Sequence, residues 1–185
     1  MGKKYQYTGT KIRPLVKDVN IKQYLTDQPI NYMYTTIDEI AALWTLNQLS
    51  KETLPSIASN MIALGSANDI IYDLAASRNS NVERNSYSLS LFLAEYYGRV
   101  LSTNEAVDIM VRVICNDILS GRIAPFWGAR RIWSELWDSN RQRVDLAVFA
   151  GLASECIDQE KYRKDYENDI VSAARNAIDG LDKCF

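Results

Sequence analysis

Apolar residues recur at steps of three and four positions along most of this chain, from about residue 35 to the C-terminal end. That spacing places the apolar side chains on one face of an α-helix, whereas a β-strand would alternate apolar and polar positions. Before residue 35 the period is missing. The pattern therefore predicts a series of amphipathic helices that follows a non-helical N-terminal segment.

Start and stop signals divide the series into separate helices. Thr36 and Ser102 each stand three residues before a glutamate, the spacing of a capping box, in which a hydroxyl and a carboxylate satisfy the first free amides of a helix. Proline suits a first helical turn because the amide hydrogen that it lacks has no partner there, and glycine suits the residue after a helix. These signals predict helices over residues 36–49, 55–64 and 70–74, a fourth that ends near residue 98, and others over 102–119, from 125, over 144–157 and over 160–178.

Short links between consecutive helices favour antiparallel neighbours. We therefore expect an all-α fold, in which residues 35–185 form a single compact bundle or array of about seven to eight antiparallel helices. The helix over residues 102–119 should be central, because its polar positions are confined to a strip near Asp108, Arg112 and Asn116. No exact repeat is visible, but a loose array of helical hairpins stays open as the alternative.

The N-terminal segment, residues 1–34, differs from the rest in charge. It carries a net charge of +4, while the other 151 residues carry −6 and the whole chain carries −2. We expect an irregular, basic arm that packs on the helical body. Its aromatic rings could instead stack on RNA bases, but no RNA-binding or helix-turn-helix motif accompanies them, so nucleic acid is not an expected partner. The tyrosines of the arm are Tyr5, Tyr7, Tyr24, Tyr32 and Tyr34.

Composition excludes several classes of active site. The chain contains no histidine, which removes Ser-His-Asp and Cys-His catalysis and histidine-ligated zinc or haem. It also lacks a nucleophile elbow, a P-loop, a dinucleotide-binding motif and zinc-ligand spacing. We therefore expect no enzyme activity, no catalytic residue, no metal and no cofactor. A ligand-binding or catalytic cavity built on Glu95 and Asp117 is the weakest alternative.

Cysteine usage and the N-terminus bear on the compartment. Cys115, Cys156 and Cys184 are odd in number and widely spaced, which is typical of reduced residues rather than of a disulfide framework. The N-terminus has no apolar signal region, and no run of about 18 apolar residues occurs. These features favour a cytoplasmic protein without a membrane partner.

Two features are candidates for a partner-binding surface. In the segment over residues 125–137, an exposed tryptophan beside an arginine would make an interface anchor; the alternative is that its three tryptophans belong to the core. The second feature is an acidic run near the C-terminus, which could bind a basic protein surface or could be a solvated face of paired charges. The candidate residues are Trp127, Arg130 and Trp137 in the first feature, and Glu155, Asp158, Glu160, Asp165, Glu167 and Asp169 in the second.

The segment from Asp117 to Trp133 resembles part of a known class of protein. In it a helix ends at Gly121, Pro125 follows, and a Gly-Ala-Arg helix opens at Gly128. Over these residues the chain resembles small bacterial proteins of the toxin-immunity type. The resemblance implies a protein that binds and neutralises a cognate toxin in the cytoplasm without catalysis of its own. It carries no toxin-contact residues over to this sequence.

The function expected from the sequence is therefore that of a non-catalytic protein-binding module, an immunity protein that covers a basic toxin surface with its acidic face. The alternative is a helical-repeat-like scaffold or regulatory module that binds a cellular protein along the concave side of a hairpin array. A long groove of exposed apolar residues would favour this alternative.

Overall fold

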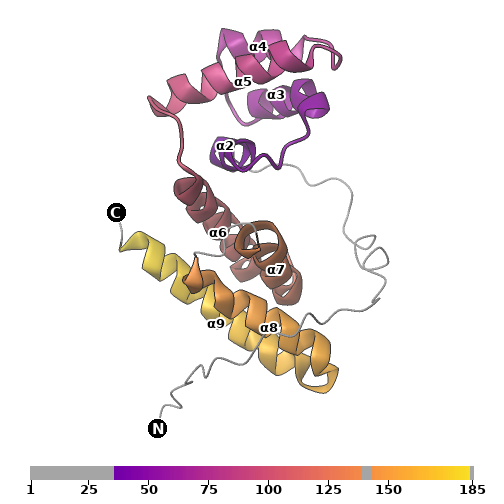
Figure 1. Ribbon diagram of the computed structural model, residues 1–185, viewed down its shortest axis with the longest axis vertical. Coiled ribbons are helices and arrows are strands. Elements are labelled where there is room, and N and C mark those ends of the chain that lie inside the picture. Colours follow the sequence, from indigo (N-terminus) through magenta and orange to yellow (C-terminus); the bar gives the residue numbers. More distant parts are fainter. Residues whose placement is uncertain (1–35, 139–142, 184–185) are drawn as a thin grey trace. The chain divides into compact units, whose positions relative to one another are not determined.

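The computed structural model describes residues 36–138 and 143–183 (Figure 1). Within these residues it contains eight α-helices and no strand, which confirms the all-α fold class and the expected number of helices. The predictions for the arm, residues 1–34, and for Cys184 lie outside the described residues. The helices are α2 (Ile37–Thr45), α3 (Leu54–Ala63), α4 (Asp69–Ala75), α5 (Val82–Tyr97), α6 (Thr103–Leu119), α7 (Pro125–Arg131), α8 (Ala147–Asp158) and α9 (Arg163–Asp182).

Shorter helical elements extend or connect these helices. Three are 3-10 turns, and the fourth is a π-helix that continues α7 without a break. They are η1 (Lys51–Thr53), η2 (the π-helix, Ile132–Trp137), η3 (Val144–Leu146) and η4 (Glu160–Tyr162).

Helix α6 is central, as its sequence predicts. It packs against α2, α7 and α9, while α8 and α9 lie side by side as a hairpin and α3, α4 and α5 pack on one another (Figure 1). The polar strip of α6 is used for ion pairs. Asp108 pairs with Arg143 before η3, at 2.8 Å, and Arg112 pairs with Asp182 at the end of α9, at 2.6 Å.

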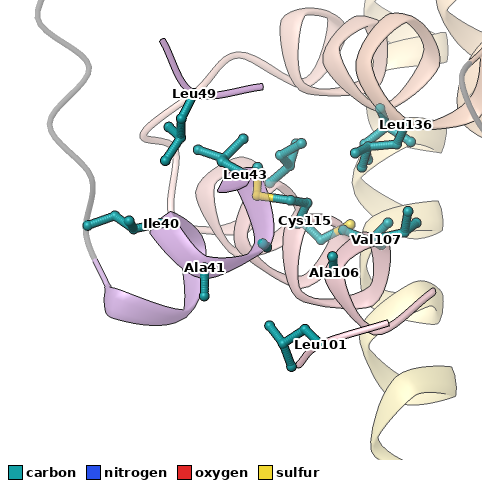
Figure 2. Close-up of a cluster of buried hydrophobic side chains, with 14 of the residues drawn as sticks. Ile40, Ala41, Leu43, Leu49, Leu101, Ala106, Val107, Cys115 and Leu136 are labelled. Atoms are coloured by element: carbon teal, nitrogen blue, oxygen red, sulfur yellow. The ribbon is translucent and has the colours of Figure 1, made fainter. Parts of the chain in front are cut away.

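The core is built where α2 lies across α6 (Figure 2). Leu43 of α2 lies beside Cys115 of α6, while Ile40 lies on another side of α2 (Figure 2). Both of these α2 residues are buried, as are Val107 and Cys115. Burial raises the pKa of the Cys115 thiol to about 12, because a thiolate is poorly solvated in apolar surroundings. Cys115 is thus an inert core residue.

Helix ends follow the predicted caps. The capping box at Ser102 is complete: its Oγ accepts from the amide of Glu105 at 3.3 Å, and the Glu105 carboxylate accepts from the amide of Ser102 at 2.9 Å. At the other predicted box, Thr36 Oγ1 accepts from the amide of Glu39 at 3.1 Å. The Glu39 side chain is fully buried.

A close approach of two helices fixes the position of α7. A Cβ atom on Gly128 would lie 2.4 Å from Cγ1 and 2.5 Å from Cδ1 of Ile118, far inside van der Waals contact. Ile118 is 4% exposed near the end of α6, so it has little room to move away. Only glycine therefore lets α7 pack this closely on α6.

We predict that Gly128→Ala lowers the free energy of unfolding by about 1–3 kcal/mol, because the added methyl group overpacks this contact. Gly180→Ala is the matched control. That glycine also lies in a helix, but a methyl group added there would meet no atom within 4 Å, so alanine should stabilise by up to about 1 kcal/mol. Urea unfolding measures the free energy of unfolding of both variants. Equal stability of the two variants would contradict the close approach, and Ile118→Val should restore part of the loss in Gly128→Ala.

We also predict an acid-dependent contribution from Glu105. Hydrogen bonds from Arg99 and then from Ser102 lower the pKa of its carboxyl from 4.5 to about 2. A pKa that is lower in the folded state stabilises the fold above the unfolded value, and this contribution is lost as the pH falls toward the folded value. Glu105→Gln keeps the cap but loses the charge. Its deficit in unfolding free energy against the wild type should therefore shrink between about pH 5 and pH 2; a deficit independent of pH would refute the assignment.

Candidate partner-binding surface

The acidic run is gathered at the turn of the α8–α9 hairpin. Helix α8 ends at Asp158, η4 makes the turn, and α9 begins at Arg163. Because the two helices lie side by side, carboxylates that precede the turn and carboxylates that follow it share this end of the hairpin. They are Glu155, Asp158 and Glu160 before α9, and Asp165, Glu167 and Asp169 on its first two turns.

Two of the six carboxylates are paired locally. Glu167 lies 3.3 Å from Arg163 Nε one helical turn earlier. Glu155 accepts a hydrogen bond from Gln159 and lies beside Tyr166. The pKa of Tyr166 is raised first by burial of its hydroxyl and then by the charge and hydrogen bonding of Glu155. These contacts stabilise the hairpin turn. Arg163 offsets the charge of Glu167, whereas Glu155 keeps its charge because Gln159 and Tyr166 are neutral.

The other four carboxylates are exposed, and within the described part of the chain they form no ion pair or side-chain hydrogen bond. No ion pair in the described structure joins the basic residues of the turn to these four carboxylates. Arg163 is held by Glu167, Lys161 Nζ lies 5.2 Å from the centre of the Tyr162 ring, and Lys164 is exposed. Over residues 155–169 six carboxylates stand against three basic side chains, so the turn keeps a net charge of −3, with Asp158, Glu160, Asp165 and Asp169 as its unpaired acids.

A chain of contacts connects this acidic surface to the tryptophan segment. Arg163 lies over the Phe126 ring, with Cζ 4.5 Å from its centre, and the Phe126 and Trp127 ring centres are 5.0 Å apart. Arg130 in turn lies 5.9 Å from the Trp127 ring centre. Trp127 and Arg130 therefore belong to the same end of the molecule as Glu167. Phe126 and Arg163 make this connection, and no sequence motif marks either of them.

Trp137 lies apart from this group. It ends the π-helix η2, which contacts η3 at the beginning of α8, whereas the acidic turn follows the end of α8. Along the helix, ten residues separate it from Trp127, about 15 Å. All three tryptophans of the segment are half-buried and pack against the core. Of the candidate residues in this segment, the structure therefore brings only Trp127 and Arg130 near the acidic turn.

The carboxylates considered for a cavity are not brought together in one. Glu95 is exposed on α5. Asp117, at the end of α6, is 5% exposed and pairs with Arg122 Nη2 at 2.5 Å. Among the residues described, no group of three or more cysteines and carboxylates is placed to hold a metal ion. None of the helices described has both the length and the apolar character needed to span a bilayer.

Comparisons with protein families, with curated proteins and with solved structures found no match to this chain.

We predict that Asp158→Asn raises the free energy of unfolding by about 0.3–1 kcal/mol at low salt. The carboxylate lies at the negative C-terminal end of the α8 dipole with no basic residue in that turn. Asp182→Asn is a matched comparison, because Asp182 is also the last residue of its helix but pairs with Arg112. Its replacement should stabilise less or destabilise, as the ion pair is lost. Urea unfolding of both variants at low and high salt measures the change in the free energy of unfolding. An equal increase in the two variants would contradict the prediction.

Proposed function

We propose that this chain is a non-catalytic protein-binding module that neutralises a partner, in the manner of a cytoplasmic immunity protein that binds a cognate toxin. One observation carries the proposal: four exposed carboxylates without local partners share the α8–α9 turn with the half-buried pair of Trp127 and Arg130. The partner would present a basic surface to the turn.

The physics of association fits these two components. A surface of net negative charge attracts a basic partner over a distance of about 8–10 Å at physiological salt and raises the association rate. Tryptophan and arginine are the residues that most often supply the binding energy once the surfaces meet. Trp127 is held by Phe126 and Arg130, so little side-chain entropy remains to be lost on binding.

The resemblance at residues 117–133 supports the same class of function. It lies on the end of α6 and on α7, and Trp127 and Arg130 fall within it. The segment that resembles toxin-immunity proteins thus borders the acidic turn. The acidic turn was identified from its charge, independently of the resemblance. The lack of histidine agrees with a protein that binds without catalysis.

The test is co-expression with the product of the neighbouring gene. We expect this chain to relieve the toxicity of that product and to co-purify with it. The double reversal Asp158→Lys and Asp169→Lys should weaken the complex about tenfold or more and reduce protection, because attraction becomes repulsion. Binding is measured by calorimetry at two salt concentrations, since an electrostatic interface weakens with salt.

A matched control separates this surface from net charge. Asp73→Lys with Asp179→Lys changes the total charge equally but lies on α4 and on the last turns of α9, where both residues are exposed. We expect this control to leave binding within about twofold of the wild type. Binding unaffected by the reversal at Asp158 and Asp169, or weakened equally by the control, would overturn the proposal.

A further inference from the structure

A notch of about 180 Å³ lies between α2 and α5, on a different part of the chain from the acidic turn. Its floor and walls are mostly apolar, and the link from α5 to α6 closes one side. The residues that matter for its chemistry are Ala41 and Trp44 of α2, Ser90, Ala94 and Tyr97 of α5, and Val100 of the link.

Two hydrogen bonds hold the walls together. Trp44 Nε1 donates to Ser90 Oγ at 3.2 Å, and the Tyr97 hydroxyl donates to the Asp38 carboxylate. Asp38 and Trp44 lie on α2, and Ser90 and Tyr97 lie on α5, so both bonds join the same two helices. Trp44, Ser90 and Tyr97 also line the notch.

Small residues at the middle of each wall explain why the space is left open. Ala41 lies midway between Asp38 and Trp44, and Ala94 lies midway between Ser90 and Tyr97. Both line the notch. A longer side chain at either position would reduce the space, so both alanines keep the notch open.

The polar groups around the notch are already satisfied. Burial and then the hydrogen bond to Asp38 raise the pKa of Tyr97 well above its usual range, so this hydroxyl stays protonated and donates to Asp38. Arg99, which lines the mouth, pairs with Glu105. The guanidinium of Arg99 is thus paired and the Tyr97 hydroxyl is neutral, so the mostly apolar lining favours an uncharged group over an ion.

The size of the notch limits the occupant to one bulky side chain. Sites for whole small-molecule ligands measure about 300–1,000 Å³, whereas a cavity of about 150 Å³ holds one benzene ring. The lining adds exposed apolar surface, because Val100 is 80% exposed. A pocket for one ring with an apolar rim is the form taken by an anchor site in a protein interface.

We propose that the notch is a second interaction site, which receives one aromatic or leucine side chain from an uncharged segment of a polypeptide partner. It differs in kind from the acidic turn. Binding here depends on apolar burial and is insensitive to salt, whereas binding at the turn is electrostatic. The site stands independently of the function proposed above.

The experiment uses amino-acid amides as probes of the anchor. N-acetyl-phenylalanine amide and N-acetyl-leucine amide are titrated into the full chain, and the indole N–H resonance of Trp44 is followed by NMR. We expect saturable shifts with dissociation constants on the order of millimolar, and no shift with N-acetyl-alanine amide. Shifts should be the same at low and high salt. A lack of saturation, or equal shifts from the alanine probe, overturns the proposal.

Variants test whether the probe occupies the notch. Ala94→Leu fills it and should abolish the shift, while Glu95→Leu adds the same side chain at an exposed position that does not line the notch and should leave the shift intact. Val100→Asp places a charge on the exposed rim without entering the core, and should weaken binding about tenfold. Binding that survives both Ala94→Leu and Val100→Asp overturns the site.

A titration with benzene tests the kind of occupant. Benzene that binds more tightly than the phenylalanine amide would assign the notch to a free small molecule and overturn the proposal of a polypeptide anchor.

Discussion

The close packing of α7 on α6 is the constraint on which the surface features depend. Gly128 leaves no room for a methyl group against Ile118, and this contact sets where Phe126 and Trp127 lie. From that position Phe126 reaches Arg163 at the beginning of α9. If α7 stood further from α6, the tryptophan segment and the acidic turn would be separate surfaces.

The core and the surfaces are coupled through α6 in a second way. Its apolar faces pack against three helices, and its polar strip forms two ion pairs at the open end of the α8–α9 hairpin, through Asp108 to Arg143 and through Arg112 to Asp182. These pairs are partly exposed, so each adds little stability. Their effect is to fix the hairpin in position on α6, which holds the acidic turn at its far end.

Much of the fold could be predicted from the sequence, because local signals determine it. The apolar period, the hydroxyl at Ser102 and the proline at position 125 act within a few residues, and the structure places helices where they indicate. The contact of Arg163 with Phe126 could not be predicted, since it joins residues 37 positions apart through packing alone. The π-helix at Ile132–Trp137 was also missed, and it moves Trp137 away from the position that an α-helical period gives it.

The notch could not be predicted for a different reason. Alanine is equally typical of a filled helix interface, so Ala41 and Ala94 indicate an open space only once two hydrogen bonds join the helices around them.

The carboxylates of the acidic turn fall into two groups, those that stabilise their own helix and those that destabilise it. Asp165 lies in the first turn of α9, where the helix dipole favours a carboxylate. Asp158 lies at the end of α8, where the dipole disfavours it, and Asp169 stands one turn beyond Asp165 and is repelled by it. Each of these two residues costs the fold a few tenths of a kcal/mol with no contact in the described structure to offset the cost. Natural sequences keep such costs chiefly at functional positions. Asp158 and Asp169, rather than Asp165, are therefore the residues on which the proposed partner binding would depend.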